Sequence, residues 1–188
     1  MTVYSEMSEE ELSEVVEESE RKENFKALVE ICQNCCAKGD FETAMEESLD
    51  ALLRLSAGSA KIDILKASNV CDMVPLALQK YQEEAAIIEV LFGLIRNLSK
   101  SEEMRTSLGR HATLIVKCMN EHSDGEATLQ EMACLAIEAM CCTGHLVNAG
   151  LMQTAGAPTC LENVSRPSIT NERNLTYPDR ALKAIRGL

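Results

Sequence analysis

Hydrophobic positions recur along this chain in a segment of eight or nine residues that appears four times. The copies are LDALLRLS from Leu49, LFGLIRNLS from Leu91, ACLAIEAMC from Ala133 and ALKAIRGL from Ala181. Aligned, they place one apolar side chain in a common column at steps of 42, 42 and 48 residues: Leu53, Ile95, Ile137 and Ile185. Apolar spacings of three and four predict one amphipathic helix per copy, with this column buried.

The segments between the copies also recur. The strings ILKASNV from Ile64, SLGRHATL from Ser107 and LMQTAGAP from Leu151 each fit the end of a short helix. A second helix follows each string. Pro75 and Pro158 each fit the first turn of such a helix, where the missing backbone N–H of proline breaks no helical hydrogen bond. These three units are therefore each predicted to contain a short, a medium and a long helix, whereas the first unit lacks an obvious short helix. Self-similarity at this period predicts an α-solenoid, whose units bury their apolar faces by stacking.

The chain divides into an acidic N-terminal helix, residues 1–23, and a repeat domain, residues 24–188. The approximate units are 24–57, 58–99, 100–143 and 144–188. Ser8 and Glu11 form a capping-box pattern, and Leu12, Val15 and Val16 form a narrow apolar stripe among glutamates. We expect this helix to pack weakly and to be dispensable for folding; the alternative is a capping helix for the first repeat. Residues 165–179, rich in Pro, Asn, Ser and Thr, predict a loop.

Two short strings resemble the armadillo repeat family. Leu94 to Ser99 (LIRNLS) is similar to the end of the family's long third helix, and Ala155 to Pro158 (AGAP) to its turn into the second helix. The resemblance covers roughly Phe25 to Leu188 and implies an all-α, right-handed α-solenoid of about four armadillo-like repeats. HEAT repeats, with two helices per unit and a similar period, are the alternative. A tetratricopeptide array is disfavoured by its period of about 34 residues.

The composition and charge of the chain limit the classes of partner that it is expected to bind. The net charge is −12, and nine glutamates lie between Glu6 and Glu23, so phosphate backbones and anionic membranes are disfavoured and a basic protein or peptide is favoured. Aromatic residues make up 3% of the chain and Trp is absent, which indicates a core of aliphatic, Met and Cys side chains. We find neither a secretion signal nor a membrane-spanning run, so we expect a cytoplasmic protein without membrane insertion.

The resemblance implies that the long helices line a concave groove, so columns of charge along them are candidate binding sites. Two columns stand out, with Glu138 interrupting the second: Glu47, Glu89, Glu131 and Asp179; and Arg54, Arg96 and Arg186. They could hold an extended segment of a partner. The alternative is that these charges complement the helix dipoles and face solvent.

Asn97 matches the family's Asn that, in nuclear-import members, holds the backbone of an extended basic ligand. The Trp four residues before that Asn is Gly93 here, so the aromatic slots for lysine stems are missing. Binding of nuclear-import signals is therefore disfavoured, although Asn97 stays a candidate groove residue.

Enzyme chemistry has little support. Cys32, Cys35 and Cys36, with Cys71, could suggest a metal or redox motif, but core packing is favoured for all of them, as for Cys141 and Cys142. Cys142 and His145 could form a dyad, but repeats rarely provide the pocket and the oxyanion donor that it needs. We therefore expect no catalytic residue, no metal and no cofactor.

The sequence thus favours a non-enzymatic protein-binding adaptor or scaffold that holds a partner segment in the concave groove. Two alternatives stay open. One is a structural subunit of a larger cytoskeletal or ciliary assembly, binding through the convex face or the C-terminal end. The other is a thiol-dependent enzyme or sensor.

Overall fold

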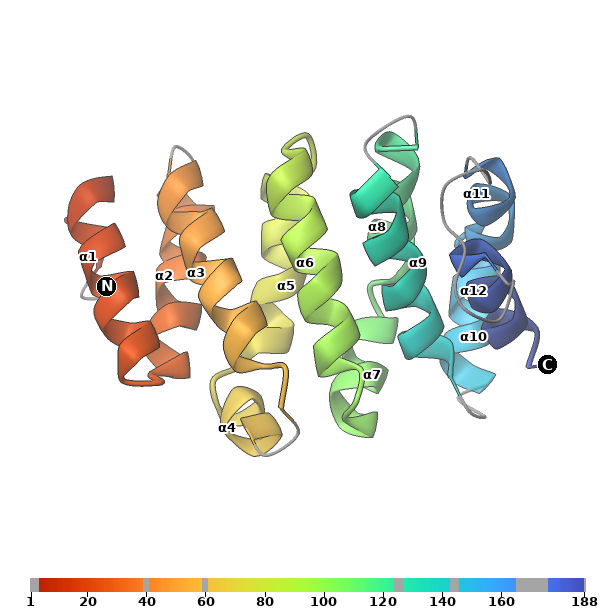
Figure 1. The fold of residues 1–188 in the computed structure, drawn as a ribbon, viewed down its shortest axis with the longest axis horizontal. Helices are drawn as coiled ribbons and strands as arrows, with labels where there is room; N and C mark the ends of the chain where they lie inside the picture. Colours follow the sequence, from red (N-terminus) through yellow and green to blue (C-terminus); the bar gives the residue numbers. More distant parts are fainter. Residues whose placement is uncertain are drawn as a thin grey trace.

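The computed structural model describes residues 4–38, 41–58, 61–123, 127–142, 146–164 and 176–187, which form twelve α-helices and no strand. In chain order these are α1 (Glu9–Arg21), α2 (Phe25–Lys38), α3 (Glu42–Leu55), α4 (Ile62–Ala67), α5 (Val70–Lys80), α6 (Ala85–Leu98), α7 (Glu102–Gly109), α8 (Ala112–Glu121), α9 (Ala127–Cys141), α10 (Leu146–Thr154), α11 (Ala157–Asn163) and α12 (Tyr177–Arg186). The prediction of an all-α solenoid is confirmed (Figure 1).

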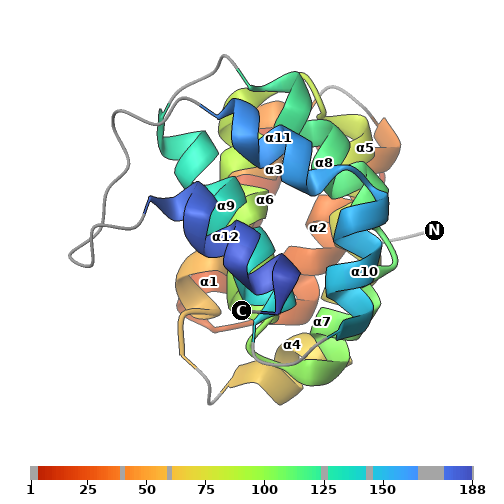
Figure 2. The same ribbon diagram turned by 90° about the vertical axis from the view of Figure 1, so that its right-hand side faces the viewer.

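The helices stack in rows. Helices α1, α3, α6, α9 and α12 each pack on the next one and form what we call the long-helix row. A second row, α2, α5, α8 and α11, packs behind it, and the short helices α4, α7 and α10 lie along one edge (Figures 1 and 2). The sets α4–α6 and α7–α9 repeat the predicted order short, medium and long. In the third set, α10–α12, the prediction was wrong for the first two helices, since α10 has 9 residues and α11 has 7, although α12 is the longest with 10.

One continuous apolar core runs from Leu12 to Ile185. In the predicted column Ile95, Ile137 and Ile185 are buried, at 0%, 0% and 2% exposure. Leu53 is only half-buried, so the prediction was wrong for this copy. Its side chain faces Gly93 of α6, where an added Cβ would lie 3.1 Å from Leu53 Cδ1, and glycine has no side chain to cover it.

Helix α1 is an integral member of the long-helix row. Leu12 and Val16 are buried against the rest of the core, and the predicted capping box of Ser8 and Glu11 is present. Glu9 Oε1 accepts hydrogen bonds from the backbone N–H groups of Thr43 and Ala44, at 2.8 and 3.3 Å. The expectation of weak packing was therefore wrong, because polar contacts supplement the narrow apolar stripe.

Two helix starts differ from expectation. Helix α5 begins at Val70, after a tight link in which Asn69 has φ 60°, so Pro75 is its sixth residue and not in its first turn. Pro158 does lie in the first turn of α11. Helix α12 begins at Tyr177, so the last residues of the predicted 165–179 loop are already helical. Residues 165–175 lie outside the described part of the chain.

Among the helices that the structure describes, none combines the length and apolar character needed to cross a bilayer.

Candidate functional site

The acidic column occupies equivalent places in the row, but its members have different surroundings. Glu89 accepts a hydrogen bond from Thr128 Oγ1 of α9 at 2.9 Å. Glu131 accepts one from the Tyr177 hydroxyl of α12, which raises the pKa of Tyr177. Asp179 contacts Thr176 Oγ1 at 2.5 Å, within the N-terminal cap of α12. Only Glu47 is exposed to solvent.

Glu89 and Glu131 therefore each contact the first turn of the next long helix, as Glu9 does at the start of α3. Carboxylates in these places accept hydrogen bonds and complement the positive end of the helix dipole. The geometry supports a structural use of these two side chains. Their role in recognising a ligand stays a prediction.

Glu47 lies instead in an open cleft of about 510 Å³ between α1 and α3. The cleft is lined by Ser13, Glu14, Val16, Glu17, Glu20, Glu47, Asp50 and Arg54. Five of these eight side chains are carboxylic acids, and one is basic. Glu47 and Arg54 are candidate residues predicted from the sequence. The contribution of α1 was not predicted, because its sequence lacks the repeat pattern.

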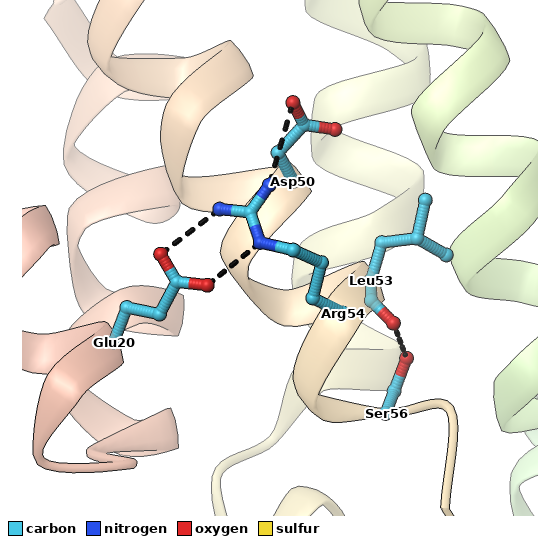
Figure 3. A network of polar contacts seen from close by, with 5 residues as sticks. All are labelled: Glu20, Asp50, Leu53, Arg54 and Ser56. Atoms are coloured by element: carbon cyan, nitrogen blue, oxygen red, sulfur yellow. Dashed lines mark hydrogen bonds and ion pairs between the residues drawn. The ribbon is translucent and has the colours of Figure 1, made fainter.

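Arg54 is held by two acids of this cleft (Figure 3). Its Nε and Nη2 donate to Glu20 Oε1 and Oε2 at 2.7 and 2.9 Å, and its Nη1 lies 3.9 Å from Asp50 Oδ2. The hydrogen bond from Arg54 lowers the pKa of the Glu20 carboxyl group. Glu14, Glu17 and Glu47 form no ion pair with any residue that the structure describes. The cleft therefore keeps a strong negative charge.

The members of the basic column also have different surroundings. Arg186 lies 3.6 Å from a Glu162 carboxylate oxygen of α11, whereas Arg96 is exposed and has no ion pair within the described ranges. Glu138, which interrupts the column, accepts from Arg180 of α12 at 3.0 and 2.8 Å. Arg180 was not among the candidate residues predicted from the sequence. A signal was present, because Arg180 follows Glu138 by 42 residues, one repeat period.

Asn97 joins two neighbouring units. Its Nδ2 donates to the backbone oxygen of Leu53 at 3.3 Å and to Ser56 Oγ at 3.1 Å, and its Oδ1 accepts from Lys100 Nζ at 3.1 Å. Lys100 Nζ also donates to the Ala57 oxygen at 3.0 Å. Asn97 therefore satisfies polar groups at the C-terminal end of α3. Whether it also binds a ligand stays a prediction.

The cysteine motif is embedded in the core. Burial raises the pKa of Cys32 well above its ordinary value, and raises the pKa of Cys35, Cys36 and Cys71 to about 12, 11 and 11. These groups are thiols, not thiolates, near neutral pH. No group of three or more His, Cys, Asp or Glu side chains in the described ranges could hold a metal ion.

The proposed dyad falls partly outside the described residues, since His145 is not among them. Cys142 is half-buried, and its thiol donates to the Ala139 oxygen at 3.2 Å. His122 Nε2 lies 2.8 Å from the Gln82 backbone oxygen, a contact that links α8 to the preceding unit.

Comparison with solved structures decides the fold. A designed armadillo repeat protein superposes on 86% of this chain with a TM-score of 0.68 and 18% sequence identity. The chain has an armadillo-like fold. The three-helix units fit the armadillo pattern better than the two-helix HEAT alternative. The chain spans 64% of the length of the designed armadillo protein. No protein-family model and no curated protein matches the sequence.

Proposed function

We propose that this armadillo-like chain is a non-enzymatic adaptor or scaffold that binds a basic segment of a partner protein through the exposed side of its long-helix row. The observation that carries the proposal is the acidic cleft between α1 and α3. It has room for the side chains of an extended segment, and Glu14, Glu17 and Glu47 have no ion-pair partner among the described residues.

The physical basis is charge complementarity at short range. A Lys or Arg side chain in the cleft would lie within one Debye length of several carboxylates, about 8–10 Å at moderate salt. Each exposed pair contributes only about 0–1 kcal/mol, so affinity has to come from several pairs acting together. Binding of this kind is weakened by salt and depends little on the exact sequence of the basic segment.

Two observations favour binding over catalysis. The buried cysteines have raised pKa values, so they lack the thiolate that a thiol enzyme or redox sensor uses. The described residues also provide no metal-binding group. A repeat fold with an extended charged surface fits an adaptor better than either chemistry.

Fluorescence anisotropy tests the proposal with a labelled peptide rich in Lys and Arg. The variant E14Q/E17Q/E47Q should weaken binding about tenfold, if each lost pair contributes about 0.5 kcal/mol, and should flatten the salt dependence. The matched control is E83Q/E84Q/E102Q, which removes three exposed acids outside the cleft. Equal affinities for wild type and both variants would rule out the cleft as the binding site.

A second candidate function has one specific observation in its favour. Helix α10 exposes Leu146, Val147 and Leu151 at 74%, 65% and 38%, and apolar groups gathered on a surface often mark an interface. This would suit a structural subunit of a larger cytoskeletal or ciliary assembly. If so, wild-type protein added to native extract should sediment with a large complex, and L146Q/V147Q should stay in the slow fraction.

A further inference from the structure

The second row of helices contains a cavity of its own. It has a volume of about 370 Å³ and lies between α8 and α11, which are neighbours in that row (Figure 2). We call it the α8–α11 cavity. The acidic cleft between α1 and α3 shares none of its lining residues. It is therefore a separate candidate site, outside the long-helix row.

A glycine at the start of α11 leaves one end of this cavity open. Gly156 is the N-cap of α11, whereas Asn69 and His111 are the N-caps of α5 and α8. A Cβ added at Gly156 would meet no atom within 4 Å. The preceding joint of the row, between α5 and α8, is instead bridged by Lys117 Nζ, which donates to Gln82 Oε1 at 2.8 Å.

Four neutral polar side chains surround the α8–α11 cavity. Thr113 and Asn120 lie two turns apart on α8, and Thr159 and Asn163 lie about one turn apart on α11. All four are exposed, and none forms a side-chain hydrogen bond with another residue that the structure describes. Hydroxyl and carboxamide groups both donate and accept hydrogen bonds. The two walls therefore offer donors and acceptors without charge.

The floor of the cavity is apolar. Val116 and Cys160 lie there and are buried, at 5% and 4% exposure. Lys117 is the one charged side chain among the described lining residues, and its ammonium group is held by Gln82 and lies 3.5 Å from a Glu121 carboxylate oxygen. A fitting ligand is therefore uncharged, has both N–H and C=O groups, and carries a small apolar group for the floor. An extended peptide segment has all three properties.

We propose that the α8–α11 cavity binds a short, uncharged, extended segment of a partner protein through its backbone. Asn120 and Asn163 hydrogen-bond to peptide N–H and C=O groups from opposite walls, and an apolar side chain of valine size contacts Val116 and Cys160. Asn97 already makes a contact of this type, since its Nδ2 donates to a backbone oxygen of α3 at 3.3 Å. The volume falls in the range of about 300–1,000 Å³ that is typical of ligand sites.

A nitrogen-15 NMR titration of the full chain tests the proposal. The probe is an acetylated and amidated peptide of four alternating serine and valine residues. The side-chain amide signals of Asn120 and Asn163 should shift and saturate as peptide is added. N120L/N163L should weaken binding at least about tenfold, because it removes two hydrogen-bonding groups. The matched control Q79L, which replaces an exposed amide of α5 outside the cavity, should bind like wild type.

Two further measurements separate backbone recognition from apolar contact. A probe methylated on its backbone nitrogens keeps its side chains but loses its N–H donors, so it should not bind. T113V/T159V keeps the shape of both side chains and removes two hydroxyl groups, so it should weaken binding several-fold even if N120L/N163L fails to fold. The proposal would be overturned by equal binding of the methylated probe. It would also be overturned if neither amide signal shifted at peptide concentrations up to about 10 mM.

This site is independent of the acidic cleft, and the two experiments can fail separately. E14Q/E17Q/E47Q should bind the uncharged probe like wild type, because none of these glutamates lines the α8–α11 cavity. N120L/N163L should bind the basic peptide like wild type for the same reason. Loss of both activities in either variant would contradict two separate sites.

Discussion

Gly109 of α7 and Asn148 of α10 are in direct contact across two units of the solenoid. A Cβ added at Gly109 would lie 2.0 Å from Asn148 Oδ1. Asn148 is fully buried, and its Nδ2 donates to the backbone oxygens of Arg105 and Met140 at 2.9 and 3.1 Å. The amide therefore cannot move aside without giving up both hydrogen bonds.

Gly109→Ala should consequently lower the free energy of unfolding by about 1–3 kcal/mol, the usual range for overpacking. Gly150→Ala is the matched control, because it is also helical and an added Cβ meets no atom within 4 Å. It should raise stability by about 0.4–1 kcal/mol by restricting the unfolded chain. Urea titration measures both, and similar effects of the two substitutions would contradict the observed contact.

Ile95→Ala should cost about 2–5 kcal/mol, because the side chain is fully buried between stacked helices. Leu53→Ala should cost less, since Leu53 is half-buried opposite Gly93. Thermal and urea unfolding of the two variants compare them directly. A larger loss for Leu53 than for Ile95 would mean that the register of the column is wrong.

Leu12→Ala should also destabilise the whole chain by about 2–5 kcal/mol, because Leu12 belongs to the common core. Glu17→Gln, on the exposed side of α1, should change stability by less than about 0.5 kcal/mol. If Leu12→Ala left the urea midpoint unchanged, α1 would be an appendage that can be removed, as its sequence suggested.

Alkaline pH should destabilise the protein through its buried thiols. Burial raises the pKa of Cys35, Cys134 and Cys141 from 9.0 to about 12 in the folded state. Their stabilising contribution is complete below pH 9 and is lost as pH rises toward 12, because the unfolded chain releases these protons first. Melting temperatures measured from pH 8 to about pH 11 should fall.

Cys35→Ala provides the control for this pH dependence. It removes one buried thiol, so its melting temperature should decline less steeply with pH than that of the wild type. If the melting temperatures of Cys35→Ala and the wild type fell equally steeply with pH, the loss of stability at alkaline pH would come from groups other than Cys35.

The repeat period and the three-helix units could be predicted from sequence because they depend on apolar spacing, which survives as Ile95, Ile137 and Ile185 in the core. The environment of Leu53 could not, since it depends on Gly93 in the next unit. The start of α5 was also missed. Proline is favoured in the first turn of a helix, so Pro75 predicted a start close to it. The tight link at Asn69 instead starts α5 at Val70, five residues before Pro75.

The candidate site was predictable only in part. Glu47 and Arg54, which belong to the two charge columns, line one cleft, and their role in binding a partner stays a prediction. The columns could not separate Glu47, which faces solvent, from Glu89 and Glu131, which contact the next helix, because that choice depends on side-chain direction at each joint. The partner of Arg54, Glu20, lies on a helix without the repeat signature, so no periodicity indicated it.

Side chains that reach from one unit to the next hold the joints of the long-helix row, such as Glu9 at the start of α3 and Asn97 at the end of α3. Every extensive contact between described helices of different units joins adjacent units. A pulling force along the row is therefore borne by a series of similar links. Under tension the molecule should lengthen in steps, as the contacts between one pair of adjacent units open at a time.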